Sequence, residues 1–204
     1  MLDDLLRPMK ERVLTPLATA VGGQVHPMAV TLAAFALGLG AAAAAAVGAN
    51  RAGLALWLAN RVLDGFDGTL ARAQGRQTDL GGYVDIVLDF VVYAAIPLGL
   101  VLGAPPGPGT LALAALAMLA SFYVNAASWM YLSAILERRG AGAVARGEST
   151  TVTMPRGLVG GTETIVLFAL FFVLPTMQVR LFVLVTALVV ATALQRLVWA
   201  IRRL

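Results

Sequence analysis

Long apolar stretches, separated by short polar or glycine-rich turns, dominate the chain. About 20 consecutive apolar residues in a helix are enough to cross the hydrocarbon core of a bilayer. Six stretches approach this length, so the pattern predicts an all-α integral membrane protein with six transmembrane helices. We place these spans at residues 28–49, 52–73, 80–102, 109–136, 158–174 and 179–200.

Residues 1–22 differ from the later stretches, because charged residues alternate there with Leu, Met and Val. This alternation favours an amphipathic helix lying in the membrane interface, with a frayed tail as the alternative. We expect the helix to be broken or bent near Pro8 and Pro16, since proline removes a helical hydrogen bond. The chain is therefore predicted to form a single domain, 1–204, in which this helix precedes a six-helix bundle at 28–200.

Composition supports the membrane assignment, since 59% of the residues are hydrophobic and only 13% are charged. Soluble domains carry about 25% charged residues. A net charge of +4 would suggest nucleic-acid binding in a soluble protein, but the basic residues here fall between apolar stretches, as juxtamembrane charges do. We therefore expect no nucleic-acid partner. The chain has no cysteine, which excludes disulfides and thiolate metal sites.

The distribution of Lys and Arg predicts the orientation, because cytoplasmic loops of membrane proteins carry the excess of these residues. Six spans place both termini and the links after the second and fourth spans on one side. That side holds 12 of the 15 basic residues, namely Arg7, Lys10, Arg12, Arg72, Arg76, Arg138, Arg139, Arg146, Arg156, Arg196, Arg202 and Arg203. The other side holds Arg51 and Arg180, and Arg61 lies within the second span. We predict a multi-pass protein of the cytoplasmic (inner) membrane with both termini in the cytosol.

Four aspartates lie within the second and third spans, where a carboxylate costs roughly 2.5–3.5 kcal/mol at the centre of a spanning helix. Asp64 and Asp67 are three residues apart and share one helix face, and Asp85 and Asp89, four apart, share a face of the next helix. Such charges persist only if they are compensated. Oxygen ligands suit Mg²⁺ or Mn²⁺, and four carboxylates balance two divalent ions. The pattern thus predicts a two-metal carboxylate site.

The two aspartate-bearing helices are expected to be antiparallel neighbours, because only a short link connects them. At 1.5 Å per residue, Asp67 lies about 9 Å from the cytosolic end of its span. By the same measure Asp85 and Asp89 lie roughly 7 and 13 Å from the cytosolic start of theirs. The carboxylates would then meet at one level, open to the cytosol. A cation pathway or a proton relay is the alternative explanation for aspartates at this depth.

Small and basic residues accompany the aspartates. Gly68 and Ala71 on the same helix, and Gly81 across the gap, leave room for a flat group. Arg72 offers a two-pronged donor to phosphate. Arg61, earlier on the same helix, is either a second phosphate ligand or the salt-bridge partner of a nearby carboxylate. Since a two-metal site clamps phosphoryl oxygens in an in-line displacement, this set favours phosphoryl-transfer chemistry.

The run from Asp64 to Asp89 resembles the signature of the CDP-alcohol phosphotransferase, or phosphatidyltransferase, family, written D-x2-D-G-x2-A-R-x8-G-x3-D-x3-D, at every fixed position. The layout of the rest of the chain also resembles bacterial inner-membrane members. The resemblance implies a homodimeric membrane enzyme that holds the CMP half of a CDP-linked donor beside the small residues and the arginine of the motif. It further implies transfer of a phosphoalcohol group onto a hydroxyl acceptor with release of CMP.

Within this resemblance, Asp89 is the base that activates the acceptor hydroxyl. Asp64, Asp67 and Asp85 chiefly hold two Mg²⁺ or Mn²⁺ ions, with Asp89 as a further candidate ligand. Bacterial-looking members usually take CDP-diacylglycerol as donor, so we expect a phospholipid-synthesis enzyme that transfers a phosphatidyl group. Transfer from a CDP-linked small alcohol to a lipid acceptor is the alternative, and a divalent-cation transporter is a minor one.

The link after the fourth span carries candidates for holding the acceptor. Arg138, Arg139 and Arg156 either bind an anionic acceptor, such as a polyol phosphate or a lipid headgroup, or serve only as positive-inside charges. Glu163 lies in the first turn of the fifth span at cytosolic depth. It either contacts the acceptor or stabilises the positive end of the helix dipole.

Overall fold

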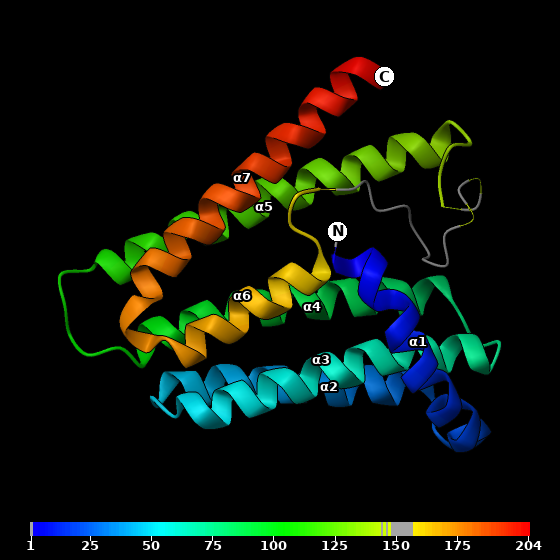
Figure 1. The fold of residues 1–204 in the computed structure, drawn as a ribbon, viewed down its shortest axis with the longest axis horizontal. Coiled ribbons are helices and arrows are strands. Elements are labelled where there is room, and N and C mark those ends of the chain that lie inside the picture. Colours follow the sequence, from blue (N-terminus) through cyan, green and yellow to red (C-terminus); the bar gives the residue numbers. More distant parts are fainter. Residues whose placement is uncertain (1, 144, 146, 148–156) are drawn as a thin grey trace.

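The computed structural model describes residues 2–143, 145, 147 and 157–204, and these residues form helices and turns without strands (Figure 1). Side chains are described from Arg12 onward. The helices are α1 (Leu2–Val21), α2 (Pro27–Ala46), α3 (Asn50–Ala73), α4 (Asp79–Leu102), α5 (Thr110–Arg138), α6 (Gly161–Val173) and α7 (Gln178–Arg203). Two short 3₁₀ turns, η1 (Gly22–Gln24) and η2 (Pro175–Met177), precede α2 and α7. The all-α prediction is confirmed.

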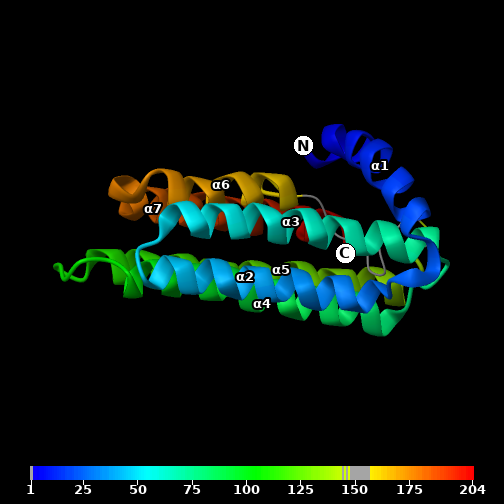
Figure 2. The same ribbon diagram turned by 90° about the horizontal axis from the view of Figure 1, so that it is seen from below.

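Helices α2 to α7 run along the long axis of the molecule in two layers. One layer contains α3, α6 and α7, and the other contains α2, α4 and α5 (Figure 2). A buried apolar core lies within this bundle and includes Trp57, Ile96, Met118, Phe168 and Phe182. Its aromatic rings meet edge-on or tilted, for example Trp57 and Phe168 with centroids 5.3 Å apart, an arrangement that adds to the stability from burial alone.

Glycine allows α2 and α4 to pack closely. A Cβ at Gly99 would overlap the carbonyl oxygen of Ala42, and one at Gly103 would overlap that of Ala45. Small residues at helix interfaces are typical of membrane proteins, where close van der Waals contact replaces the hydrophobic effect as the force between helices. This contact fixes α4, and with it the second aspartate pair, against α2.

Four helical segments among the described residues are long and apolar enough to cross a membrane: Pro27–Ala46, Asp79–Leu102, Thr110–Arg138 and Pro175–Arg203. The other two predicted spans differ for separate reasons. Helix α3 is long enough, but five charged side chains lower its hydropathy. Helix α6 begins at Gly161 rather than at residue 158, and its 13 residues reach about 20 Å against the roughly 30 Å of a hydrocarbon core.

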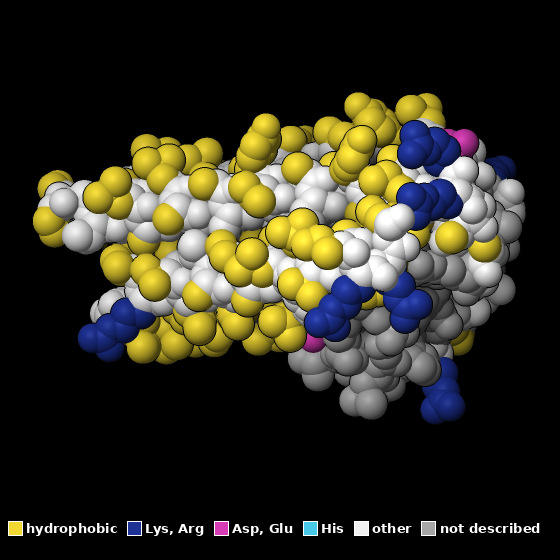
Figure 3. All heavy atoms as spheres, turned by 90° about the horizontal axis from the view of Figure 1, so that it is seen from above, with side chains coloured by type: hydrophobic (Ala, Val, Ile, Leu, Met, Phe, Trp, Pro, Cys, Tyr) yellow, Lys and Arg dark blue, Asp and Glu magenta, His cyan; other side chains and the backbone are white. Residues whose placement is uncertain are grey.

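The two ends of the bundle differ in charge. The turns after α2, α4 and α6 lie at one end, and the α3–α4 turn, the end of α5 and the C-terminus lie at the other (Figure 1). Seen from above, hydrophobic side chains cover much of the length, while Lys and Arg gather toward the end that carries the C-terminus (Figure 3). The sequence places the site motif near this more basic end.

Helix α1 is continuous from Leu2 to Val21, so of the two outcomes expected near Pro8 and Pro16 the break is not present, and the bend stays a prediction. It packs against α3 and α6. Ala18 is buried with Leu70 and Val30 in a small apolar cluster. The helix is thereby attached to the end of α3 that follows the first aspartate pair.

Candidate active site

The two aspartate pairs approach each other across a gap between α3 and α4. The backbones of these helices come close at few points, and α2 packs extensively against both. The predicted antiparallel neighbours thus lie side by side, joined by side chains such as Arg61 and Asp89, while α2 packs closely against each of them. Charged side chains bridge the remaining space.

Arg61 on α3 makes the central bridge to α4. Its Nη2 lies 2.6 Å from Oδ1 of Asp89 and its Nη1 lies 3.3 Å from Oδ2, so the guanidinium donates to both carboxylate oxygens. The same Nη1 lies 3.6 Å from Oδ2 of Asp64. Arg61 is only 8% exposed. Arg61 is therefore a salt-bridge partner of nearby carboxylates, one of the two roles predicted for it.

Asp67 is the most deeply buried of the four aspartates, with 6% of its surface exposed. Its Oδ2 accepts a 2.6 Å hydrogen bond from the hydroxyl of Thr31 on α2. A buried carboxylate needs such donors, because removal from water is costly for a charge. Helix α2 thus contributes directly to the site.

Asp64 lies close enough to the other charged side chains of the cluster to interact with all of them. It interacts through charge with Asp67, Asp85 and Asp89 as well as with Arg61. Within the part of the chain that the structure describes, however, no three acidic, His or Cys side chains are arranged so that they could hold a metal ion as they stand. Arg61 pairs with Asp64 and Asp89, and Thr31 donates to Asp67.

The donor set nevertheless fits a hard divalent cation. It consists of carboxylate oxygens, with the Thr31 hydroxyl beside Asp67, and contains no nitrogen or sulfur ligand. Mg²⁺ and Mn²⁺ prefer such oxygen donors.

The remaining motif residues lie at the same end of the bundle. A Cβ at Gly68 would meet only the Arg72 guanidinium, at 3.5 Å, so space is open above this residue. Arg72 is exposed and its Nη2 donates to the Thr69 hydroxyl at 3.2 Å. Ala71 is half-buried.

Gly81 has a structural role that the motif alone does not reveal. Its backbone N–H donates to the hydroxyl oxygen of Thr78 at 3.0 Å, which caps the N-terminus of α4. A Cβ at Gly81 would approach that oxygen to 3.1 Å. Glycine here keeps the capped turn compact just before Asp85.

The predicted acceptor residues divide into three cases. Arg138 and Arg139 are exposed at the end of α5, and the Arg139 guanidinium donates to the Leu204 carbonyl oxygen at 3.3 and 3.4 Å. Glu163 accepts a 3.0 Å hydrogen bond from the backbone N–H of Gly160, as an N-terminal helix cap does. Arg156 lies outside the described residues.

Sequence reasoning missed three residues that make polar contacts inside the bundle. Thr31 gives no signal, since a hydroxyl in an Ala-rich helix is common. Tyr93 is four residues after Asp89 and shares its helix face, which could have drawn attention to it; its hydroxyl accepts from Arg61 Nη1 at 3.1 Å. Arg196 was read as a juxtamembrane charge, yet it is 5% exposed and donates to Asn125 Oδ1 at 2.9 Å.

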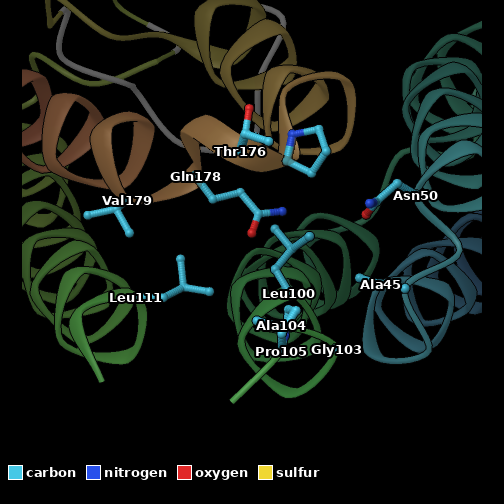
Figure 4. Close-up of a pocket in the computed structure, with 12 residues that line it drawn as sticks. Ala45, Asn50, Leu100, Gly103, Ala104, Pro105, Leu111, Thr176, Gln178 and Val179 are labelled. Atoms are coloured by element: carbon cyan, nitrogen blue, oxygen red, sulfur yellow. The ribbon is translucent and has the colours of Figure 1, made fainter. Parts of the chain in front are cut away.

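A cavity of about 240 Å³ lies away from this cluster, at the opposite end of the bundle. The turns after α2, α4 and α6 border it, and side chains such as Leu100, Leu111 and Gln178 line it (Figure 4). None of the predicted site residues lines it. The candidate active site is therefore the charged cluster between α3 and α4, not this cavity.

Comparison with known proteins agrees with the geometry. A family model described as CDP-alcohol phosphatidyltransferase matches residues 24–199. The inner membrane protein YnjF of Escherichia coli is 37% identical over 151 residues, which are 74% of this chain and 71% of that protein. The archaetidylinositol phosphate synthase of Methanothermobacter thermautotrophicus is 27% identical over 203 residues, covering 97% of this chain and 93% of that protein.

Solved structures with the same fold include the phosphatidylinositol phosphate synthase of Mycobacterium tuberculosis with CDP-DAG bound. It superposes with a TM-score of 0.69 at 21% identity, over 91% of this chain and 92% of that one. The same enzyme with manganese and citrate gives 0.70, also at 21% identity, over 92% and 89%. With the family model covering most of its length and a relative at 37% identity, the chain belongs to the CDP-alcohol phosphatidyltransferase family, a family of membrane transferases.

Proposed function

We propose that this protein transfers a phosphatidyl group from CDP-diacylglycerol to a hydroxyl acceptor and releases CMP. The observation that carries the proposal is the position of Asp64, which interacts through charge with the other three motif aspartates. Four carboxylates close enough to interact through charge suit metal-assisted phosphoryl transfer. Family membership makes the divalent-cation transporter an unsupported alternative.

The chemistry is an in-line displacement at the phosphorus that bears the diacylglycerol. The acceptor oxygen forms a new bond to this phosphorus, and the bond from the phosphorus to the bridging oxygen breaks. CMP leaves with that oxygen and its electron pair, and the acceptor's proton passes to Asp89. Asp89 is the proposed base because, of the two motif aspartates on α4, it lies further from the Thr78 cap and so deeper in the bundle, toward the expected position of the lipid-linked phosphorus.

Asp64, Asp67 and Asp85 are the proposed metal ligands, and two Mg²⁺ or Mn²⁺ ions match their charge together with that of Asp89. When bound, such ions offset the charge of the pyrophosphate and of the departing CMP. Manganese in the solved mycobacterial relative supports a divalent ion here. Arg72 is exposed beside Gly68 and would hold a donor phosphate.

A phosphorylated acceptor is the class we favour. Arg196 is a buried cation whose Nε has no hydrogen-bond partner among the described residues. Arg196 lies seven residues, or about 10 Å, before the end of α7. Asp89 lies about 15 Å from the start of α4, which is at the same end of the bundle. An anionic group would satisfy Nε, and the relatives named as phosphatidylinositol phosphate and archaetidylinositol phosphate synthases support a polyol phosphate.

The membrane arrangement belongs to the same proposal. Six crossings, with α3 and the short α6 held inside the bundle, put both termini and the motif on the cytosolic side, as the bias in Lys and Arg requires. The 1–22 segment would lie in the cytosolic interface. We also propose a homodimer in the inner membrane. YnjF is named an inner membrane protein, which supports the location.

The test is to follow labelled substrates with the purified protein. CDP-diacylglycerol labelled in its acyl chains is supplied with Mn²⁺ and either inositol phosphate, glycerol phosphate, inositol or serine. Label in a new phospholipid, formed only with a phosphorylated acceptor, supports the proposal. Turnover only with a CDP-linked small alcohol and a lipid acceptor would support the reverse alternative instead.

A further inference from the structure

We propose that the cavity at the end of the bundle opposite the candidate active site binds an uncharged group that carries several hydroxyls, either a free small polyol or the polyol headgroup of a lipid. The inference goes beyond the proposed function and uses none of the motif residues. The cavity holds about 240 Å³, several times the volume of one water molecule. It therefore has room for a group of the size of glycerol or of a small hydroxylated ring.

Gln178, the first residue of α7, supplies a buried amide that is only partly satisfied. The residue is 8% exposed, and its Nε2 donates to the backbone oxygen of Phe171 at 3.2 Å. No donor among the described residues reaches its Oε1. Figure 4 shows the Gln178 amide extending among the lining side chains, with its oxygen toward Leu100. Because a buried acceptor without a donor is costly, an O–H group of a ligand at this point is stabilising.

Two further polar side chains line the same cavity from other elements. Asn50 begins α3 and is half-buried, and Thr176 lies in η2. The Asn50 amide is directed across the cavity toward that of Gln178 (Figure 4). Within the part of the chain that the structure describes, neither side chain makes a hydrogen bond. Amides and hydroxyls both donate and accept, and ligand hydroxyls do the same, so these groups match several hydroxyls on one ligand.

The cavity offers no partner for a charge. None of the described residues that line it is acidic or basic. Helices α2, α4 and α6 end at this side of the bundle, whereas α3, α5 and α7 begin there, so the partial charges of the helix ends offset one another. A buried charge without a partner is costly. Leu100, Leu111 and Val179 instead present apolar surface to the carbon atoms of a ligand. These features favour an uncharged polyol group.

Such a group has two sources. A free polyol enters from the aqueous phase, whereas a lipid places only its headgroup in the cavity and keeps its phosphate outside. Arg51 and Arg180 are exposed, and they directly follow the lining residues Asn50 and Val179 in the chain. Cations next to the cavity suit a phosphate at its mouth. The hydroxylated headgroup is common to both sources, and the experiment separates them.

The test measures binding to the purified protein in a detergent whose headgroup has no hydroxyl, such as a dimethylamine oxide. Ligand-observed NMR reports binding of glycerol and myo-inositol. Native mass spectrometry compares retention of phosphatidylglycerol and phosphatidylinositol with that of phosphatidylcholine, which has a phosphate but no headgroup hydroxyl. Binding of the free polyols identifies the soluble source. Preferential retention of the two hydroxylated lipids identifies the lipid source.

Two variants show whether this binding belongs to the cavity. Gln178→Leu removes the amide, so binding should weaken about tenfold. Because Gln178→Leu also removes the hydrogen bond to Phe171, Thr176→Trp is the second variant. It fills the cavity from an exposed position, leaves that bond in place and should abolish binding. Met177→Trp is the matched control, because Met177 is the next residue, is 38% exposed and does not line the cavity.

Arg196→Gln separates the cavity from the candidate active site, where a polyol acceptor is also proposed to bind. Cavity binding should be unchanged in this variant. Binding that is lost in Arg196→Gln and kept in Thr176→Trp would overturn the proposal, and so would wild-type protein that shows no hydroxyl-dependent binding. Melting temperatures identify a cavity variant that does not fold, and the other cavity variant then decides. None of these measurements uses CMP release, so the proposed function and this inference fail independently.

Discussion

The hydroxyl of Thr31 on α2 donates a 2.6 Å hydrogen bond to the carboxylate of Asp67 on α3, and both side chains are buried. This bond links a helix outside the motif to the least exposed of the four aspartates. Replacing Thr31 by Val should destabilise the metal-free protein by about 1–3 kcal/mol. Valine has nearly the shape of threonine but no hydroxyl, so the buried Asp67 carboxylate loses a hydrogen-bond donor. Thermal unfolding with and without Mn²⁺ measures this, and added Mn²⁺ should restore part of the loss.

Thr31→Ser is the matched control, since it keeps the hydroxyl and removes one methyl group. It should unfold closer to wild type than Thr31→Val does. Equal unfolding temperatures for Thr31→Val and wild type would show that the bond does not stabilise Asp67.

The aspartates should divide into two groups by substitution. Asp89→Asn should lower turnover by about 10²–10⁴-fold, the usual contribution of a general base, and leave donor and metal binding largely intact. Asp67→Asn and Asp85→Asn should weaken metal and donor binding together. Calorimetry with Mn²⁺ and a CDP-containing donor decides the matter, and equal binding losses in all three variants would make Asp89 mainly a ligand.

Glu163 should act as a helix cap and not as an acceptor contact. Its carboxylate accepts from the Gly160 backbone N–H, so Glu163→Ala should cost about 1 kcal/mol of stability. Glu163→Gln keeps a side-chain acceptor and should cost less. Neither substitution should change the KM of the acceptor by more than about twofold; a large rise in that KM in Glu163→Gln would restore the acceptor role.

The contact between α2 and α4 should be intolerant of a single methyl group. Gly99→Ala places a Cβ against the Ala42 carbonyl oxygen and should destabilise the protein by about 1–3 kcal/mol or more. Gly40→Ala, on α2, is the matched control, because its Cβ would meet Leu56 at 3.5 Å, an ordinary contact. Similar unfolding temperatures for both variants would contradict the packing described for α2 and α4.

The sequence was sufficient to place the four motif aspartates on two successive helices, because their spacing along each helix is fixed by the motif. The contact of Asp67 with Thr31, 36 residues away, could not be predicted, since it depends on α2 fitting beside both α3 and α4. Arg61 was recognisable as a charge inside a span that needs a partner, but periodicity alone cannot choose between Asp64 and Asp89.

The helix boundaries show a similar division. The predicted spans at 52–73 and 80–102 have the same last residues as α3 and α4, and their first residues differ from those of the helices by at most two positions. The predicted start of the fifth span at 158 was too early, because hydropathy counts Leu158 and Val159 as helical, whereas α6 begins only after Gly160 and is capped there by Glu163.

The central claim is that the carboxylate cluster performs metal-dependent transfer with CMP as leaving group. The most direct measurement is CMP release from CDP-diacylglycerol by purified protein, with a phosphorylated acceptor and increasing Mn²⁺ or Mg²⁺. We predict one CMP per molecule of phospholipid product, loss of both on chelation with EDTA, and recovery when the ion is restored. Undiminished CMP release in Asp85→Asn, or product formation unaffected by EDTA, would contradict the account.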